Sequence, residues 1–287
     1  MIQPSTIQLL RFHFSLFLMP IYWFALSQVP AINWLNAIIV FIVLHVLVYP
    51  ASNGYNSYMD KDETAIGGLE QPLQPTRQLF QVTVWMDAMA VLIGFYISTY
   101  FAIGVLLYIL VSRAYSYRGI RLKQYPIIGF LTVVVFQGAV TFWLVYHGAS
   151  SDLTLEAPWP AMIAASLLIG GFYPLTQIYQ HKADKADGVT TISYVLGYRG
   201  TFIFTAVVYA LSFGVLAFWF LSSLQLTGFL LLQLFFIPTL IYFFYWAYQV
   251  WKDAAAANFK HTMQMNLIAS VCTNLAFITI LILNLFE

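Results

Sequence analysis

Long apolar segments separated by short polar connections make up almost the whole chain. Each segment is about 20 residues long, which is the length that crosses the hydrocarbon core of a bilayer as an α-helix. The pattern predicts nine transmembrane helices, at residues 8–28, 35–58, 79–98, 100–117, 126–147, 158–180, 200–223, 227–250 and 264–286. We therefore expect an all-α, polytopic membrane protein with one transmembrane domain over residues 1–287.

Four prolines lie inside the predicted helices, at Pro20, Pro50, Pro174 and Pro238. Proline lacks the backbone N–H and its ring crowds the preceding turn, so each is expected to kink or unwind its helix. Pro50 and Pro174 each stand six residues before a side-chain amide in an acidic stretch. A kink at these two positions would turn both acidic helix ends inward.

Composition narrows the class of protein. The chain is 61% hydrophobic and 8% charged, and its mean hydropathy is +0.79, which excludes an ordinary soluble domain. The net charge of +1, without a basic tract, gives no indication of nucleic-acid binding. The single cysteine, Cys272, excludes an intrachain disulfide. The first apolar segment lacks a following small-residue cleavage site, so it is expected to be a retained helix.

The positive charges predict the orientation in the membrane. All twelve Lys and Arg residues lie in alternate connections or at their borders: Arg11; Lys61 and Arg77; Arg113, Arg118, Arg121 and Lys123; Lys182, Lys185 and Arg199; Lys252 and Lys260. The intervening connections contain none. Because positive loops stay in the cytoplasm, the N-terminus is predicted to be cytoplasmic and the C-terminus external. We expect an integral protein of the cell inner membrane.

An acidic cluster follows the second predicted helix. Asn56, Asp60 and Glu63 are spaced so that a helix would carry all three on one face, and Asp62 lies beside them. Carboxylates crowded together repel one another unless a cation lies among them. Hard oxygen ligands of this kind suit Mg²⁺ or Ca²⁺.

A second cluster repeats this spacing 124 residues later, after the sixth predicted helix. Its matched polar residues are Gln180, Asp184 and Asp187, and a Tyr-Pro pair precedes both clusters at the same distance. The match is a weak internal repeat, which divides the chain into halves at about 1–125 and 126–287. The alternative is that either cluster is only a solvated loop that ends a helix.

A basic segment lies between the two clusters along the chain. It runs from Arg113 to Lys123 and also contains Arg118 and Arg121, and this segment and both acidic clusters are predicted to face the cytoplasm. Basic residues at a membrane border bind anionic lipids by default. Carboxylates, a divalent metal and Lys or Arg side chains together are also what holds a diphosphate, because the metal bridges acid and phosphate while the cations neutralise the remaining oxygens.

These stretches resemble the two aspartate-rich motifs of the UbiA-type intramembrane prenyltransferases. N-S-Y-M-D-K-D-E at 56–63 is similar to the first motif, Asn-Asp-x-x-Asp-x-x-x-Asp, and Q-H-K-A-D-K-A-D-G-V-T-T at 180–191 is similar to the second, Asp-x-x-x-Asp. The helix count and a Lys after the fourth helix also agree. The chain departs from the family where Ser57 and Thr64 replace Asp in the first motif and Gln180 replaces the leading Asp of the second.

The resemblance implies nine helices around a central cavity, a prenyl diphosphate donor, Mg²⁺ as cofactor and a lipophilic, aromatic acceptor. It implies that Asp60 and Asp184, helped by Asp62, Glu63 and Asp187, hold the metal, and that Asn56 and Gln180 orient the diphosphate. Lys123, with Arg118 or Arg121, would neutralise the leaving diphosphate. Aromatic faces stabilise carbocations, and the tyrosines nearest the charged helix ends are Tyr115, Tyr117, Tyr55 and Tyr179.

There are three alternative functions. An ion-coupled transporter also uses repeated halves and carboxylates, although it places them near the membrane midplane. A phosphatidyltransferase is not supported, because its Asp-Gly-x-x-Ala-Arg signature is missing. A non-catalytic relative of the prenyltransferases fits the missing aspartates.

Isolated polar residues inside the predicted helices have less specific interpretations. Asp87 is expected to face a cavity or to pair with an Arg, and Gln137 to bond another helix or contact an acceptor. His13 and His45 are expected to be packed histidines, and no zinc site is predicted.

Overall fold

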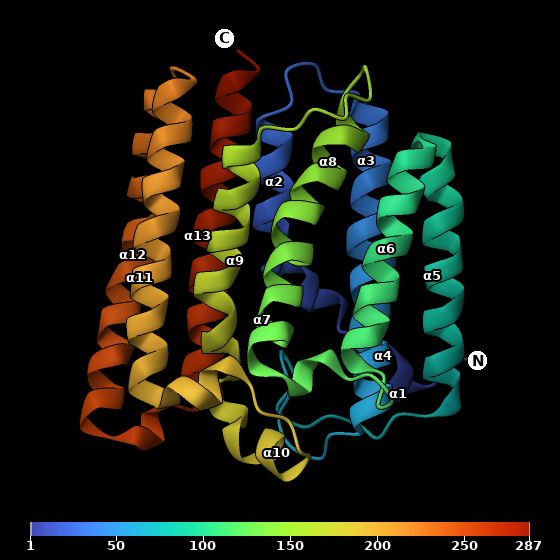
Figure 1. The fold of residues 1–287 in the computed structure, drawn as a ribbon, viewed down its shortest axis with the longest axis vertical. Coiled ribbons are helices and arrows are strands. Elements are labelled where there is room, and N and C mark those ends of the chain that lie inside the picture. Colours follow the sequence, from blue (N-terminus) through green and yellow to red (C-terminus); the bar gives the residue numbers. More distant parts are fainter. Residues whose placement is uncertain (1, 287) are drawn as a thin grey trace.

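The structure is a computed structural model that describes residues 2–286, and among these residues it contains helices and no β-strand (Figure 1). Within residues 2–286, eight helices or continuous helical runs are long and apolar enough to span a membrane, and a bent pair makes a ninth if it is counted as one span. The prediction of an all-α, polytopic membrane protein is confirmed, and the nine predicted helices agree with eight or nine candidate spans. The spans after the first two are α5 (Arg77–Ile97), α6 (Thr99–Ser116), α7–η4–α8 (Pro126–Val134, Val135–Val140, Thr141–Ala149), α9 (Trp159–Gln177) continued by η5 (Ile178–Gln180) and α10 (His181–Ala186), α11 (Ile192–Ser222), α12 (Leu226–Lys252) and α13 (Phe259–Asn284).

The first span is broken, where the sequence predicted one helix over 8–28. It consists of α1 (Pro4–Leu10), the 3-10 helix η1 (Phe12–Phe17) and α2 (Met19–Ser27), with a bend of 42° before α2. Pro20 stands in the first turn of α2, where a missing N–H costs nothing. A second break lies at Arg11, whose backbone is left-handed with φ 49°.

The other prolines act differently from one another. The second span runs through α3 (Trp34–Phe41), a π-helical segment η2 (Ile42–Val48) and α4 (Tyr49–Asp60), so the helix is wider just before Pro50. Pro174 lies inside α9, which gives way to the 3-10 segment η5 four residues later. The predicted unwinding is absent at Pro238, because α12 continues through it as one helix.

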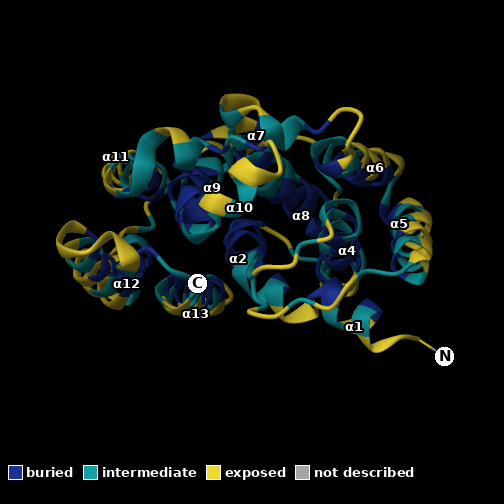
Figure 2. Cartoon of the chain, turned by 90° about the horizontal axis from the view of Figure 1, so that it is seen from below, coloured by how far each residue is buried: buried dark blue, intermediate teal, exposed yellow. Residues whose placement is uncertain are grey.

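Apolar side chains cover the outside of the bundle as well as its centre. Trp85 on α5 is 72% exposed and Ile241 on α12 is 66% exposed, and the outer faces of α5, α6, α11 and α12 are largely exposed (Figure 2). Phe24 packs against Phe142 and Phe277 in the core, with ring centroids 5.1 and 4.5 Å apart. An apolar exterior suits contact with lipid chains, since the bilayer core contains no water.

Both acidic helix ends lie at one end of the bundle. The last turn of α4, the segment between α6 and α7, and α10 lie together at the lower end in Figure 1, whereas the C-terminus and the connection after α8 lie at the upper end. The predicted segregation of the charged connections therefore holds in space. Inside the bundle, Asp87 forms an ion pair with Arg113, as one of its two interpretations predicted.

Candidate functional site

A cavity of about 220 Å³ opens at this lower end of the bundle. Side chains from the first span, α4, α6, α7, α9 and α10 line it, so residues far apart in the chain meet there. Its charged lining residues are Arg11, Asp60, Asp62, Lys123, Asp184 and Asp187, and its amide lining residues are Asn53, Asn56, Gln137, Gln177 and Gln180. Both acidic stretches and the Lys of the basic segment thus reach one hollow.

Asp60 is placed by the end of α4. The helix ends because Lys61 adopts a left-handed backbone with φ 54°, which closes the last turn. The side chain of Asp60 is only 5% exposed, and it forms an ion pair with Lys123. One turn earlier, the amide of Asn56 donates to the hydroxyl of Ser116 on α6 over 3.0 Å. The end of α4 is therefore held against the end of α6 through Asn56 and against the basic segment through Asp60.

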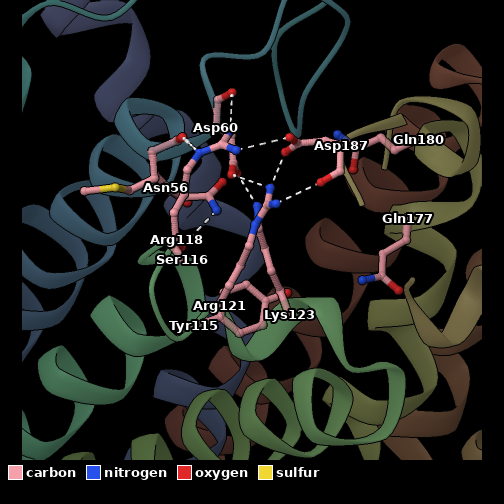
Figure 3. Close-up of polar contacts among 12 residues, drawn as sticks. Asn56, Asp60, Tyr115, Ser116, Arg118, Arg121, Lys123, Gln177, Gln180 and Asp187 are labelled. Atoms are coloured by element: carbon pink, nitrogen blue, oxygen red, sulfur yellow. Dashed lines mark hydrogen bonds and ion pairs between the residues drawn. The ribbon is translucent and has the colours of Figure 1, made fainter. Parts of the chain in front are cut away.

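The basic segment joins the two acidic helix ends (Figure 3). Arg121, also left-handed with φ 50°, forms an ion pair with Asp187 and lies 3.5 Å from Oδ1 of Asp60. Arg118 reaches Asp187 over 3.3 Å and donates to the Met59 carbonyl over 2.8 Å. Partial burial would raise the pKa of Asp187, but the hydrogen bonds and charges of Arg121 and Arg118 outweigh it, and the pKa is lowered.

The remaining cavity carboxylates have no such partners. Among the residues that the structure describes, Asp62 and Asp184 form no side-chain hydrogen bond or ion pair. Burial raises the pKa of Asp62 to about 6, and the charge of Asp60 adds to this, while Lys123 opposes it. Gln180 donates to the Ala65 carbonyl over 3.3 Å, which ties the second acidic end to the loop after α4.

The donor set fits a divalent cation that is completed by its substrate. Oδ1 of Asp60 is buried without a hydrogen bond, and Asp62 and Asp184 face the same cavity. Within residues 2–286, no three carboxylate, histidine or cysteine side chains converge into a complete metal site. Mg²⁺ commonly binds through one or two carboxylates together with water and substrate phosphates, so this set suits it.

Some of the residues predicted for the site lie elsewhere. Glu63 is exposed and does not line the cavity, and Tyr117 is 49% exposed and lies outside it. The ring of Tyr55 packs under the guanidinium of Arg113, with 3.9 Å from the centroid to Cζ. Tyr115 and Tyr179 do line the cavity. His45 is buried and bonded to Ser15 over 2.6 Å, as expected of a packed histidine.

Sequence reasoning missed several residues that line the cavity. Tyr173 bonds the hydroxyl of Tyr115 and accepts from Gln177 over 2.8 Å, and Asn53 lies one turn before Asn56. Arg11 is buried at the break in the first span. A lone Arg at the start of an apolar segment was a usable signal, because intramembrane charges are costly and usually functional.

Comparisons with known proteins agree with this geometry. The model of the UbiA prenyltransferase family matches residues 17–268. No curated protein matches the chain by sequence. Among solved structures, a UbiA homologue from Archaeoglobus fulgidus bound to GPP and Mg²⁺ has a TM-score of 0.71 at 17% identity, over 96% of this chain and 99% of that one.

Two further structures have the same fold. The apo form of a UbiA homologue from Aeropyrum pernix K1 has a TM-score of 0.68 at 17% identity, over 94% of this chain and 98% of that one. A digeranylgeranylglyceryl phosphate synthase has a TM-score of 0.62 at 17% identity, over 97% of this chain and 98% of that one. The similarity therefore extends over the whole bundle.

Proposed function

Because this chain belongs to the UbiA prenyltransferase family, we propose that it transfers a prenyl group from a prenyl diphosphate to a lipophilic, aromatic acceptor and releases diphosphate. The observation that carries the proposal is the cavity in which carboxylates from two distant helix ends face Lys123. A structural relative is described as bound to GPP and Mg²⁺, which supports the same pair of ligands here.

Asp60, Asp62 and Asp184 are the residues that would hold Mg²⁺, with the carbonyl oxygens of Asn56 and Gln180 nearby. The amide nitrogen of each is already used, by Ser116 and the Ala65 carbonyl, which leaves each carbonyl oxygen free to face the cavity. Bound Mg²⁺ would neutralise diphosphate oxygens as negative charge develops on them.

Lys123, Arg121 and Arg118 would stabilise the leaving group. In the transfer, the C–O bond between the prenyl C1 and the diphosphate breaks, and the electron pair leaves with the diphosphate. A bond then forms between C1 and the acceptor, which releases one proton to solvent. The three cations are preorganised by their ion pairs with Asp60 and Asp187, so little reorganisation accompanies the charge transfer.

The alternative functions fit the site less well. An ion-coupled carrier would place its carboxylates near the middle of the membrane, whereas these lie at one end of the bundle (Figure 1). A non-catalytic relative is favoured by Ser57 and Gln180, which replace two family aspartates. Asp62 compensates for part of this loss, because it also faces the cavity.

The orientation belongs to the same proposal. The basic connections lie at the end of the bundle that carries the cavity, so the cavity would face the cytoplasm from the cell inner membrane.

The test is donor binding and diphosphate release in lipid nanodiscs. Farnesyl and geranylgeranyl diphosphate are titrated with and without Mg²⁺ into the wild type and into Asp184→Asn, and Asp253→Asn is the matched control because Asp253 lies outside the cavity. We expect binding that requires Mg²⁺ and weakens at least about tenfold in Asp184→Asn alone, since a charge-assisted contact contributes about 1.5–3 kcal/mol. Donor binding that is unchanged by Mg²⁺ and by Asp184→Asn would favour the ion-coupled carrier.

A further inference from the structure

The short helix α10 separates two hollows of opposite charge. Asp184 and Asp187 line the cavity of the candidate site, whereas Lys182 and Lys185 line a second hollow of about 580 Å³ between α10 and the start of α11. Helical spacing places the two acids on one face of α10 and the two lysines on the opposite face. Among the residues that the structure describes, no Asp or Glu lines the second hollow. Its charge is therefore positive.

The two lysines have no acidic partner within residues 2–286, since neither forms an ion pair there. The ammonium of Lys185 donates to the hydroxyl of Tyr194 over 2.6 Å and lies 5.1 Å from the centre of its ring. That hydroxyl is neutral and leaves the charge uncompensated. Like charges one helical turn apart repel each other, so an anion bound between the lysines would remove a repulsion.

A buried polar network holds the opposite wall of the hollow in place. Gly197 combines φ 67° with ψ 175°, a conformation that essentially only glycine adopts, and it breaks α11 near its start. The hydroxyl of Thr201 donates to the Gly197 carbonyl over 2.8 Å and lies 3.1 Å from the hydroxyl of Ser193. Ser193 in turn bonds Nε2 of His181 over 2.8 Å. Because the members of this network are bonded to one another, the break is a fixed feature of the fold.

Aromatic rings and a helix end complete the lining. Tyr198 stacks on His181, with ring centroids 4.9 Å apart, and Tyr194 meets the same ring edge-on at 5.6 Å. The longer part of α11 begins directly after Gly197, so its N-terminal end lies at the hollow. The partial positive charge of that end adds to the charge of the lysines. Two cations, a hydroxyl and a positive helix end are together complementary to phosphate oxygens.

The surroundings of the hollow favour a lipid over a soluble ligand. α10 lies at the lower end of the bundle (Figure 1), and Arg199 near the start of α11 donates to the Trp251 carbonyl at the end of α12 over 2.9 Å. Lys252 lies 4.4 Å from the ring centre of Tyr248. Cations beside tyrosine and tryptophan at helix ends are typical of the headgroup level of a membrane. Val195, which precedes the break in α11, is 59% exposed, as suits contact with lipid.

We propose that this hollow binds the phosphate headgroup of an anionic membrane lipid, held by Lys182, Lys185 and the hydroxyl of Tyr194. The inference does not depend on the proposed function, because it assigns no reacting group. The bound lipid also holds α10 at the membrane border, and the opposite face of the same helix carries Asp184.

The test compares two lipids that have the same acyl chains in detergent solution. Dioleoylphosphatidylglycerol carries a net negative charge, whereas dioleoylphosphatidylcholine has the same phosphate without a net charge. Native mass spectrometry follows the lipid bound to the full chain as each lipid is titrated. We expect the first phosphatidylglycerol to bind at least about tenfold tighter than phosphatidylcholine, because two lysines face the anionic headgroup.

Two double variants remove the same charge from the same membrane border. Lys182→Gln with Lys185→Gln changes both lysines of the hollow and should lower the preference to about twofold or less. These side chains are exposed and form no ion pair within residues 2–286, so this variant should fold. Lys252→Gln with Lys260→Gln changes two exposed lysines outside the hollow and should leave the preference unchanged. Tyr194→Phe removes one hydroxyl and should reduce it about threefold.

Four outcomes overturn the proposal. The first is equal affinity of the wild type for the two lipids, and the second is a preference that survives in the double variant of the hollow. The third is an equal loss of preference in both double variants, which would show general attraction to a positive membrane border. The fourth is displacement of phosphatidylglycerol by an equimolar amount of inorganic phosphate, which would assign the hollow to a soluble phosphate compound.

Discussion

The two acidic helix ends have the same spacing in the sequence and opposite environments in the structure. Asp60 is nearly buried and paired with Lys123, whereas its counterpart Asp184 lines the cavity without a side-chain partner among residues 2–286. Their preceding tyrosines are both hydrogen-bonded, but Tyr49 is buried against Thr141, whereas Tyr173 lines the cavity. Both carboxylates thus line the cavity, but Asp60 is already held by a cation of the chain and Asp184 is not.

The cause lies in how each helix ends. α4 continues as a regular helix to Asp60, and the basic segment packs against its last turn. After Pro174, α9 changes to the 3-10 segment η5 and then to the short α10, so Asp184 is on a separate helix of six residues. A repeated spacing of polar residues therefore does not imply repeated roles.

The largest effect is expected when one carboxylate oxygen is replaced by an amide nitrogen at each of these two positions. Asp60→Asn leaves Lys123 nearly buried without its counter-ion, and removing one partner of a buried pair costs about 3–5 kcal/mol. Asp184→Asn removes no partner and replaces a carboxylate that is unpaired among residues 2–286, so it should not destabilise the metal-free protein. The measurement is thermal unfolding in nanodiscs without ligand.

A double variant is the control for this prediction. Asp60→Asn combined with Lys123→Gln should recover part of the lost stability, because the unpaired charge is gone. Equal destabilisation by Asp60→Asn and Asp184→Asn would show that the two carboxylates do not differ in how they are paired.

The second prediction uses the pH dependence of Asp62, which like Asp184 has no partner. Its pKa is raised to about 6 from 3.8, so the folded state binds more protons than the unfolded state between these values. The contribution of Asp62 to the free energy of unfolding should therefore fall by about 2 kcal/mol, after allowance for solvent screening, as pH rises from about 4 to about 6, and it should stay level above that. Asp62→Asn should remove this contribution and stabilise the metal-free protein at pH 8.

Mg²⁺ provides the control for Asp62. A bound cation favours the carboxylate, so saturating Mg²⁺ should change the slope between pH 4 and 6 more in the wild type than in Asp62→Asn. Stability that rises with pH across the same window would contradict the environment assigned to Asp62.

Hydrophobic patterning predicted most of the fold and the place of the site. Nine spans follow from segment length alone, and the shared position of Asp60, Asp184 and Lys123 follows from matching charges across connections. The ion pairs of Asp60 and Asp187 could not be predicted, because they depend on left-handed backbone conformations at Lys61 and Arg121. No local sequence pattern indicates that conformation at a Lys or an Arg. The place of Arg11 on the cavity wall was missed although its charge was a signal, because the break that positions it is a left-handed residue and not a proline.

The smallest effect is expected at Arg118, because burial and not charge alone decides how much an ion pair stabilises this end of the bundle. Arg118 reaches the same carboxylate as Arg121 and donates to the carbonyl of Met59 at the end of α4, but its side chain is 49% exposed against 8% for Arg121. Exposed ion pairs contribute about 0.2–1 kcal/mol and are screened by salt. Arg118→Gln should therefore lower the free energy of unfolding by about 0.5 kcal/mol in low salt and by less in high salt.

Arg121→Gln is the matched control. It should lower the free energy of unfolding several times more at both salt concentrations, because Asp60 and Asp187 lose a buried partner. Similar costs for the two variants in urea or thermal unfolding would mean that charge alone, independent of burial, stabilises this end of the bundle.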